Sequence, residues 1–153
     1  MAVTIEVPYN RTILSPKTLN NTYNFFSDFE KTIPSCFPGI DSFLKIQENV
    51  YDWKFKKFSY SNYEFQIHFQ TKNVCDPQKI ELHPQKNIGN CELKGTWKFS
   101  EEGSKTKVTV EVILTLNLPI PFFLKSVAAP LTNKEIIKLF DKYISNVEKA
   151  LSA

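Results

Sequence analysis

The feature that most constrains the fold is a long run of alternating apolar and polar side chains over residues 105–118. A period of two is typical of a β-strand with one buried face. Such a strand would extend about 46 Å at ~3.3 Å per residue, whereas a compact domain of 153 residues is about 38 Å across. We therefore expect it to bend within a twisted antiparallel sheet whose apolar side faces a hollow. The apolar positions are Val108, Val110, Val112, Leu114, Leu116 and Leu118.

Shorter stretches with the same period predict six further strands. The first begins at Val3 and continues past Tyr9. Leu44 and Ile46 lie on even positions while the apolar residues that follow lie on odd ones, so the buried face changes, and we predict a turn at 48–49. The remaining predicted strands cover residues 51–55, 63–71, 80–82 and 91–99.

Two short helices are predicted after the first strand. Ser15 is a candidate cap for a helix with Pro16 at its first position, and the apolar residues that follow recur every three or four positions. A second short helix over 27–33 is expected to end near Pro34, because a proline disfavours helix in the residue before it.

A long amphipathic helix is predicted at the C-terminus. Thr132 and Glu135 match a capping box at its start. An earlier helical portion over 122–129 is expected to be kinked or separated from it by Pro130. The apolar stripe of the long helix consists of Ile136, Phe140, Tyr143, Ile144, Val147 and Leu151.

The order of elements is therefore β-α-α-β6-α. It predicts a single α+β domain over 1–153 in which a curved seven-stranded antiparallel sheet wraps around the C-terminal helix. This order resembles the START-like, polyketide-cyclase (SRPBCC) superfamily, as do the segments Phe37-Pro38-Gly39-Ile40 and Leu118-Pro119-Ile120-Pro121. The resemblance implies the helix-grip fold. It also implies functions as varied as lipid, sterol and hormone binding, polyketide aromatisation or cyclisation, and partnership in larger assemblies, among which the fold does not choose.

Composition and motifs exclude several classes of protein. A net charge of +3 is too small for the many phosphate contacts of a nucleic-acid-binding protein. The longest apolar stretch, 118–131, is interrupted by prolines and is too short to cross a bilayer as a helix. The N-terminus lacks the pattern of a signal peptide. Cys36, Cys75 and Cys91 are odd in number and contain no CxxC pair, so we expect reduced thiols and a cytoplasmic location.

The sequence offers no evident catalytic residue, metal site or cofactor motif. His68 and His83 are both expected to face solvent. His68 shares the parity of the polar residues of its strand, and His83 lies on the side opposite the apolar residues of its strand. Four dispersed glycines cannot form a phosphate-binding loop. We therefore predict no metal and no cofactor. The strand carboxylates that are also expected on polar faces are Glu6, Glu64, Glu81, Glu92 and Glu111.

Aromatic side chains on the inward positions are the candidate functional feature. The chain holds 13 Phe, and its inward rings are suited either to line a pocket or to fill the core completely. Arg11 continues the inward parity of the first strand, where it is either an anion contact at the cavity mouth or a surface arginine. The predicted cavity residues are Tyr9, Arg11, Tyr51, Trp53, Tyr63, Phe65, Phe69, Trp97, Phe99, Leu114, Phe122 and Phe140.

Three functions remain open from the sequence. The preferred one is binding or transport of an apolar lipid-like or polycyclic small molecule between the sheet and the C-terminal helix. The second is a cyclase or aromatase in which Tyr51, Tyr63 or Arg11 orients a polyketide-like substrate. The third is an interaction protein whose apolar residues Phe122 and Phe123 dock on a partner or a membrane surface, or cover the pocket as a lid.

Overall fold

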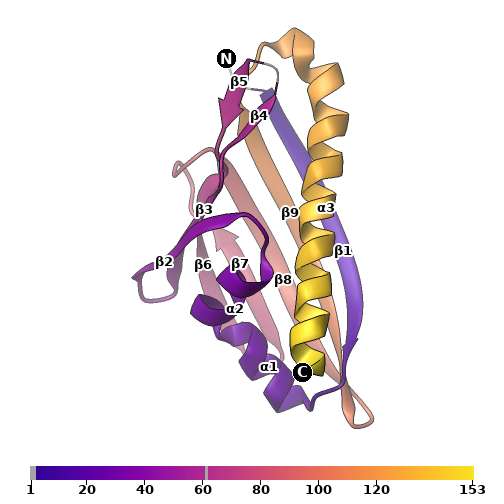
Figure 1. The fold of residues 1–153 in the computed structure, drawn as a ribbon. Helices are drawn as coiled ribbons and strands as arrows, with labels where there is room; N and C mark the ends of the chain where they lie inside the picture. The colour runs from indigo at the N-terminus through magenta and orange to yellow at the C-terminus, as the bar shows by residue number, and fades with distance from the viewer. Residues whose placement is uncertain (1–2, 61) are drawn as a thin grey trace.

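A computed structural model describes residues 3–60 and 62–153 of the chain. It contains a seven-stranded antiparallel sheet in the order β1-β9-β8-β7-β6-β3-β2, with the long helix α3 (Lys125–Ser152) lying across it (Figure 1). The predicted architecture is therefore confirmed. The strands are β1 (Val3–Ser15), β2 (Ile40–Gln47), β3 (Val50–Phe55), β6 (His68–Asp76), β7 (Lys79–Pro84), β8 (Cys91–Glu102) and β9 (Lys105–Leu118).

The first and last strands pair along their whole length. Val3 lies opposite Leu118 and Ser15 lies opposite Thr106, so β1 is longer than the sequence predicted. Ser15 therefore does not cap a helix. Its hydroxyl lies 2.8 Å from the hydroxyl of Thr22, inside the structure. Helix α1 (Leu19–Ser27) is capped instead by Thr18, whose hydroxyl accepts a hydrogen bond from a backbone amide of the first turn.

Pro34 lies inside a helix, against expectation, and Pro130 lies inside α3 without separating its two portions. Helix α2 (Phe29–Cys36) continues past Pro34, and α3 continues through Pro130 and includes Thr132, which therefore caps nothing. A proline cannot donate to the carbonyl four residues earlier. Those carbonyls belong to Glu30 and Ser126, which are exposed residues, so water can hydrate them and the helices need not end. A short 3₁₀ helix, η1 (Phe122–Leu124), leads into α3.

The β2–β3 hairpin confirms the predicted turn but reverses one prediction about its faces. Asn49 adopts the left-handed backbone conformation, φ 63°, at the tip. Leu44 and Ile46 are exposed, whereas Phe43 packs against the core, where its ring stacks on Tyr51. Register shifts near both ends of β2 disturb the simple alternation from which the face was inferred.

The predicted long strand over residues 63–71 is divided in two. β5 (Tyr63–Phe65) pairs with β4 (Phe58–Tyr60) in a separate small hairpin, and β6 begins only at His68. Between them, one backbone hydrogen bond remains, from the amide of Phe55 to the carbonyl of Ile67, and side-chain amides add two more: Gln66 donates to the carbonyl of Phe55, and Asn90 donates to the carbonyl of Gln66. Because the hairpin leaves the main sheet, it stands at one end of the molecule beside the start of α3 (Figure 1).

Candidate functional site

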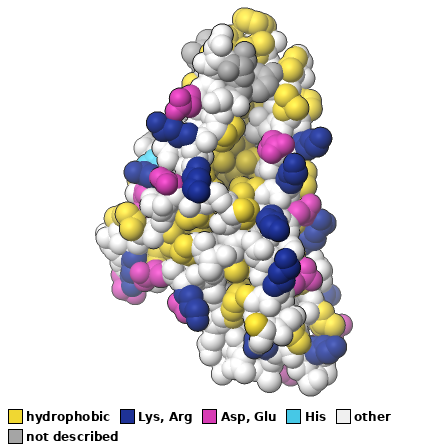
Figure 2. Space-filling view, viewed as in Figure 1, with side chains coloured by type: hydrophobic (Ala, Val, Ile, Leu, Met, Phe, Trp, Pro, Cys, Tyr) yellow, Lys and Arg dark blue, Asp and Glu magenta, His cyan; other side chains and the backbone are white. Residues whose placement is uncertain are grey.

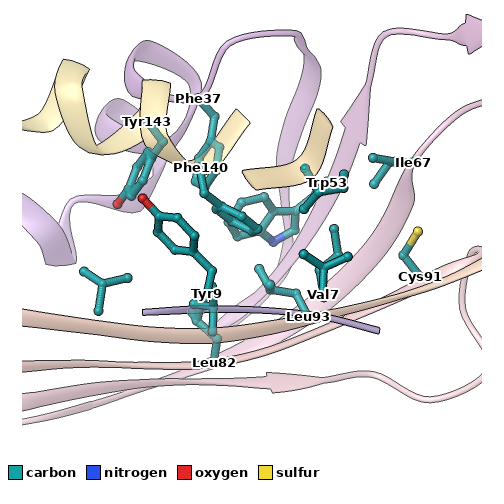
Figure 3. Close-up of a cluster of buried hydrophobic side chains, with 14 of the residues drawn as sticks. Val7, Tyr9, Phe37, Trp53, Ile67, Leu82, Cys91, Leu93, Phe140 and Tyr143 are labelled. Atoms are coloured by element: carbon teal, nitrogen blue, oxygen red, sulfur yellow. The ribbon is translucent and has the colours of Figure 1, made fainter. Parts of the chain in front are cut away.

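The space between α3 and the sheet is filled by aromatic side chains. Trp53 is 1% exposed and stacks on Phe69, with ring centroids 5.0 Å apart. The ring of Phe37 meets that of Trp53 edge to face, with ring centroids 5.7 Å apart, and stacks on that of Tyr143, with centroids 3.9 Å apart (Figure 3). An apolar void of about 10 Å³ is left beside Trp53 and Phe140, which is about the volume of one water-sized sphere. The aromatic residues therefore act as core here.

The predicted cavity residues occupy three kinds of position. Tyr63 is half-buried, whereas Arg11 and Phe122 are exposed. The others are buried within the core: Tyr9, Tyr51, Trp53, Phe65, Phe69, Trp97, Phe99, Leu114 and Phe140.

An open pocket of about 450 Å³ lies beside this core, between the first half of α3 and the segment where β3 leads into β4. Figure 2 shows it as a recess with an apolar floor. The loop after α2 forms one wall, where Gly39 turns the chain at φ 76° and its carbonyl accepts a hydrogen bond from the amide of Lys56 at 2.7 Å. The lining residues are Pro38, Gly39, Phe55, Lys56, Phe58, Ser59, Ile67, Leu131, Thr132, Glu135, Ile136 and Leu139.

The pocket lining does not coincide with the residues chosen from the sequence. Apolar side chains dominate it, and Lys56, Ser59, Thr132 and Glu135 supply polar groups. Two signals pointed to this region: the Phe-Pro-Gly-Ile segment at 37–40, and the inward parity of residues 55 and 67. Neither signal reveals that α3 and the small hairpin diverge and leave a space between them.

Arg11 joins β1 to α3 instead of lining the pocket. Its guanidinium lies 2.5 Å from a carboxylate oxygen of Asp141, and the hydroxyl of Tyr9 donates to the same oxygen at 2.6 Å. Burial, together with the hydrogen bond to this carboxylate, raises the pKa of Tyr9 above its ordinary value. The Arg11 and Asp141 side chains are about half exposed, so their pair contributes modestly to stability.

The two histidines lie outside the hollow, as predicted, but His68 is not simply solvated. Its Nε2 lies 2.7 Å from Asp52, a buried carboxylate that also accepts a hydrogen bond from Gln70 at 2.9 Å. Burial raises the pKa of Asp52, yet the hydrogen bonds from Gln70 and His68 outweigh burial and hold the pKa below its usual value. Asp52 falls on an even, polar position between the apolar residues of 51–55, and that position gives no sign that the carboxylate is buried.

The carboxylates expected on polar faces are exposed or half-buried there: Glu6, Glu64, Glu81, Glu92 and Glu111. His83 is exposed and lies 3.9 Å from Glu81. Within residues 3–60 and 62–153, no three His, Cys, Asp or Glu side chains are grouped to hold a metal ion. The same described residues include no helix with the length and apolar character needed to span a membrane.

Exposed apolar side chains gather where α3 begins. Phe122 and Phe123 are 73% and 77% exposed. Phe123, Val127 and Leu131 follow one another at intervals of four residues, so they share one face of the helical segment. We call the four exposed residues Phe122, Phe123, Val127 and Leu131 the tip patch. Leu131 also lines the pocket, so the tip patch reaches the pocket mouth.

Comparison with known proteins identifies the fold. No family model matches the chain, and no curated protein matches it in sequence. A START superfamily protein from Mycobacterium smegmatis superposes with a TM-score of 0.69 at 14% identity, covering 95% of this chain and 97% of that one. A protein from Thermus thermophilus gives 0.68 at 18% identity, with 95% and 96% covered.

A third similar structure is the Zhui aromatase/cyclase from Streptomyces sp. R1128. It superposes with a TM-score of 0.68 at 8% identity, and the match covers 96% of this chain and 94% of that one. The matches to these structures span nearly the whole chain. The chain therefore has the helix-grip fold of START-like proteins.

Proposed function

We propose that the protein binds an apolar lipid-like or polycyclic small molecule in the pocket between α3 and the β3–β4 segment. The observation that carries the proposal is an apolar-lined space of about 450 Å³, within the size range of small-molecule sites. We propose that residues 1–153 form the single domain that carries this pocket. Free Cys36, Cys75 and Cys91 support a cytoplasmic location for it.

The arrangement favours binding over the cyclase alternative. Tyr51 is buried against Phe43, Tyr63 borders a separate void of about 20 Å³, and Arg11 is paired with Asp141. None of these three side chains lines the open pocket, so none is placed to orient a substrate there. Some structural neighbours are named as aromatase/cyclases, but that likeness reaches only the fold.

Filling the pocket is expected to abolish binding. Thr132 is half-buried in the pocket wall, and a Thr132→Trp substitution places an indole in the space that a ligand would occupy. We expect the affinity for anilinonaphthalene sulfonate, measured by fluorescence titration, to fall at least about tenfold, which corresponds to ~1.4 kcal/mol of lost contacts. Native mass spectrometry of the purified wild-type protein is expected to show a co-purifying apolar compound.

A tryptophan on the opposite side of α3 is the matched control. Lys134 is exposed and lies two residues from Thr132, about half a turn around the helix. Lys134→Trp should bind the dye like the wild type. If neither an apolar compound nor the dye binds wild-type protein, or if Thr132→Trp binds it equally well, the pocket is not the site.

A second proposal concerns the tip patch, which we propose docks on an anionic lipid bilayer. Two phenylalanines more than 70% exposed are unusual on a surface facing only water. Lys125 lies 5.9 Å from the ring of Phe122, and between residues 125 and 140 the helix carries three lysines against one glutamate. Cations beside exposed aromatic rings suit an anionic membrane surface, and such docking would bring the pocket mouth to the lipids.

Removing the two rings is expected to abolish vesicle binding. Burying one Phe is worth roughly 1.5–3 kcal/mol, so the double variant Phe122→Ser, Phe123→Ser should co-sediment with phosphatidylserine-containing vesicles at least about tenfold less than wild type. Leu44→Ser with Ile46→Ser removes two apolar side chains that are 56% and 52% exposed on the β2–β3 hairpin and should leave binding unchanged. Equal co-sedimentation of both double variants would refute docking through the tip patch.

A further inference from the structure

The open pocket and the apolar void of the core share part of their lining. Phe55, Ile67 and Leu139 border both spaces. Residues that line two spaces form the wall between them, so these three side chains separate the pocket from the core. Behind the wall, the void is surrounded only by apolar side chains: Phe37, Trp53, Phe69, Leu93, Leu114 and Phe140.

The three members of this wall are held differently. Phe55 and Ile67 are 6% and 4% exposed, and the amide of Phe55 donates to the carbonyl of Ile67 at 3.0 Å, which fixes their backbones together. Ile67 is also β-branched and therefore stiff at its first side-chain torsion. Leu139 comes from the facing helix α3, and its side chain is only half-buried. A change of rotamer at Leu139 is therefore the easiest way to open the wall.

We propose that Leu139 is a gate that sets how deeply an apolar ligand enters, and hence how long a ligand the protein prefers. The inference rests on the proposed binding function and adds the class of ligand: a narrow, elongated apolar chain whose end reaches the wall. A broad rigid ring system would stop in the open pocket. Because the void behind the wall holds only about 10 Å³, a longer chain would enter chiefly the space that the shortened Leu139 side chain vacates beside Trp53 and Phe140.

The test uses displacement of anilinonaphthalene sulfonate by straight-chain alcohols from octanol to hexadecanol. Each methylene newly buried is worth about fourfold in affinity. With wild-type protein, we expect affinity to rise with chain length and then level off. With Leu139→Ala, the levelling-off should move to longer chains, so the longest alcohols gain at least about fourfold over wild type. Lys138→Ala, at an exposed position next to Leu139 that lines neither space, should keep the wild-type length preference.

The outcomes distinguish a failure of the Leu139 gate from a failure of the proposed binding function. Alanine favours helix, and Leu139 is only half-buried, so the variant should fold; Ile67→Val provides a milder opening of the same wall. Alcohols that bind wild type and both wall variants with one length preference would overturn the gate and leave the binding function standing. Alcohols that bind Leu139→Ala but not wild type would support a closed gate. No displacement by any alcohol from any of these proteins would overturn both.

Discussion

Replacing Trp53 with alanine is expected to lower the free energy of unfolding by about 3–5 kcal/mol, the range for deleting a buried large aromatic side chain. The indole is 1% exposed and contacts Phe37, Phe43 and Phe69, with ring centroids between 5.0 and 5.7 Å away. Its Nε1–H also donates to the hydroxyl of Thr71 at 3.0 Å. Deletion therefore removes aromatic packing from three sides and leaves a cavity in the centre of the core.

Urea denaturation followed by circular dichroism measures this change. Trp53→Phe retains a ring and loses mainly the hydrogen bond to Thr71, so it should cost about 1–2 kcal/mol. Phe123→Ala removes an aromatic ring that is 77% exposed and should change stability by less than about 0.5 kcal/mol. A loss below about 1 kcal/mol for Trp53→Ala would contradict a filled core, because it would mean that the space around the indole is already open or collapses without penalty.

Most of the fold could be predicted from the alternation of apolar and polar residues along the strands. The inward positions of β8 and β9 are buried along their apolar run, and the last apolar stripe lies on the buried side of α3. These elements are long, so each buried residue is supported by neighbours two or four positions away. The covering helix followed from the one-sided strand faces, because an apolar sheet face must be covered.

The same reasoning gave wrong predictions for the short elements. The alternation over 63–71 continues although the strand does not, because side-chain burial persists where the side chains of Gln66 and Asn90 supply some of the hydrogen bonds to the backbone. In β2, the register shifts bring Phe43 inward and leave Leu44 exposed. Periodicity reports which side of the chain is buried, but it does not report which backbone partner a residue has.

The location of the pocket could not be predicted from the sequence, for a different reason. Aromatic residues were expected to line it, yet large rings also pack well against one another, and here they fill the space under α3. The open volume depends on how far the β4–β5 hairpin stands from α3, which is a relation between elements distant in the chain. Polar residues of its lining, such as Lys56 and Glu135, have no distinctive spacing in the sequence.

Replacing Gly89 with alanine is expected to lower the free energy of unfolding by about 3 kcal/mol or more, for two separate reasons. Gly89 has φ +71°, a conformation that a side chain disfavours. A Cβ at this position would also lie 2.0 Å from the carbonyl oxygen of His68, which is backbone and cannot rotate away. The loop would have to move, which breaks the hydrogen bonds between Asn90 and the backbone of His68.

Gly103→Ala separates these two reasons. Gly103 has φ +64°, but a Cβ there would meet nothing within 4 Å, so this substitution should cost only about 1–2 kcal/mol for the left-handed backbone. The difference between the two variants in urea denaturation measures the close approach of the loop to His68. If both variants lose the same stability, the loop is not held against β6 at His68.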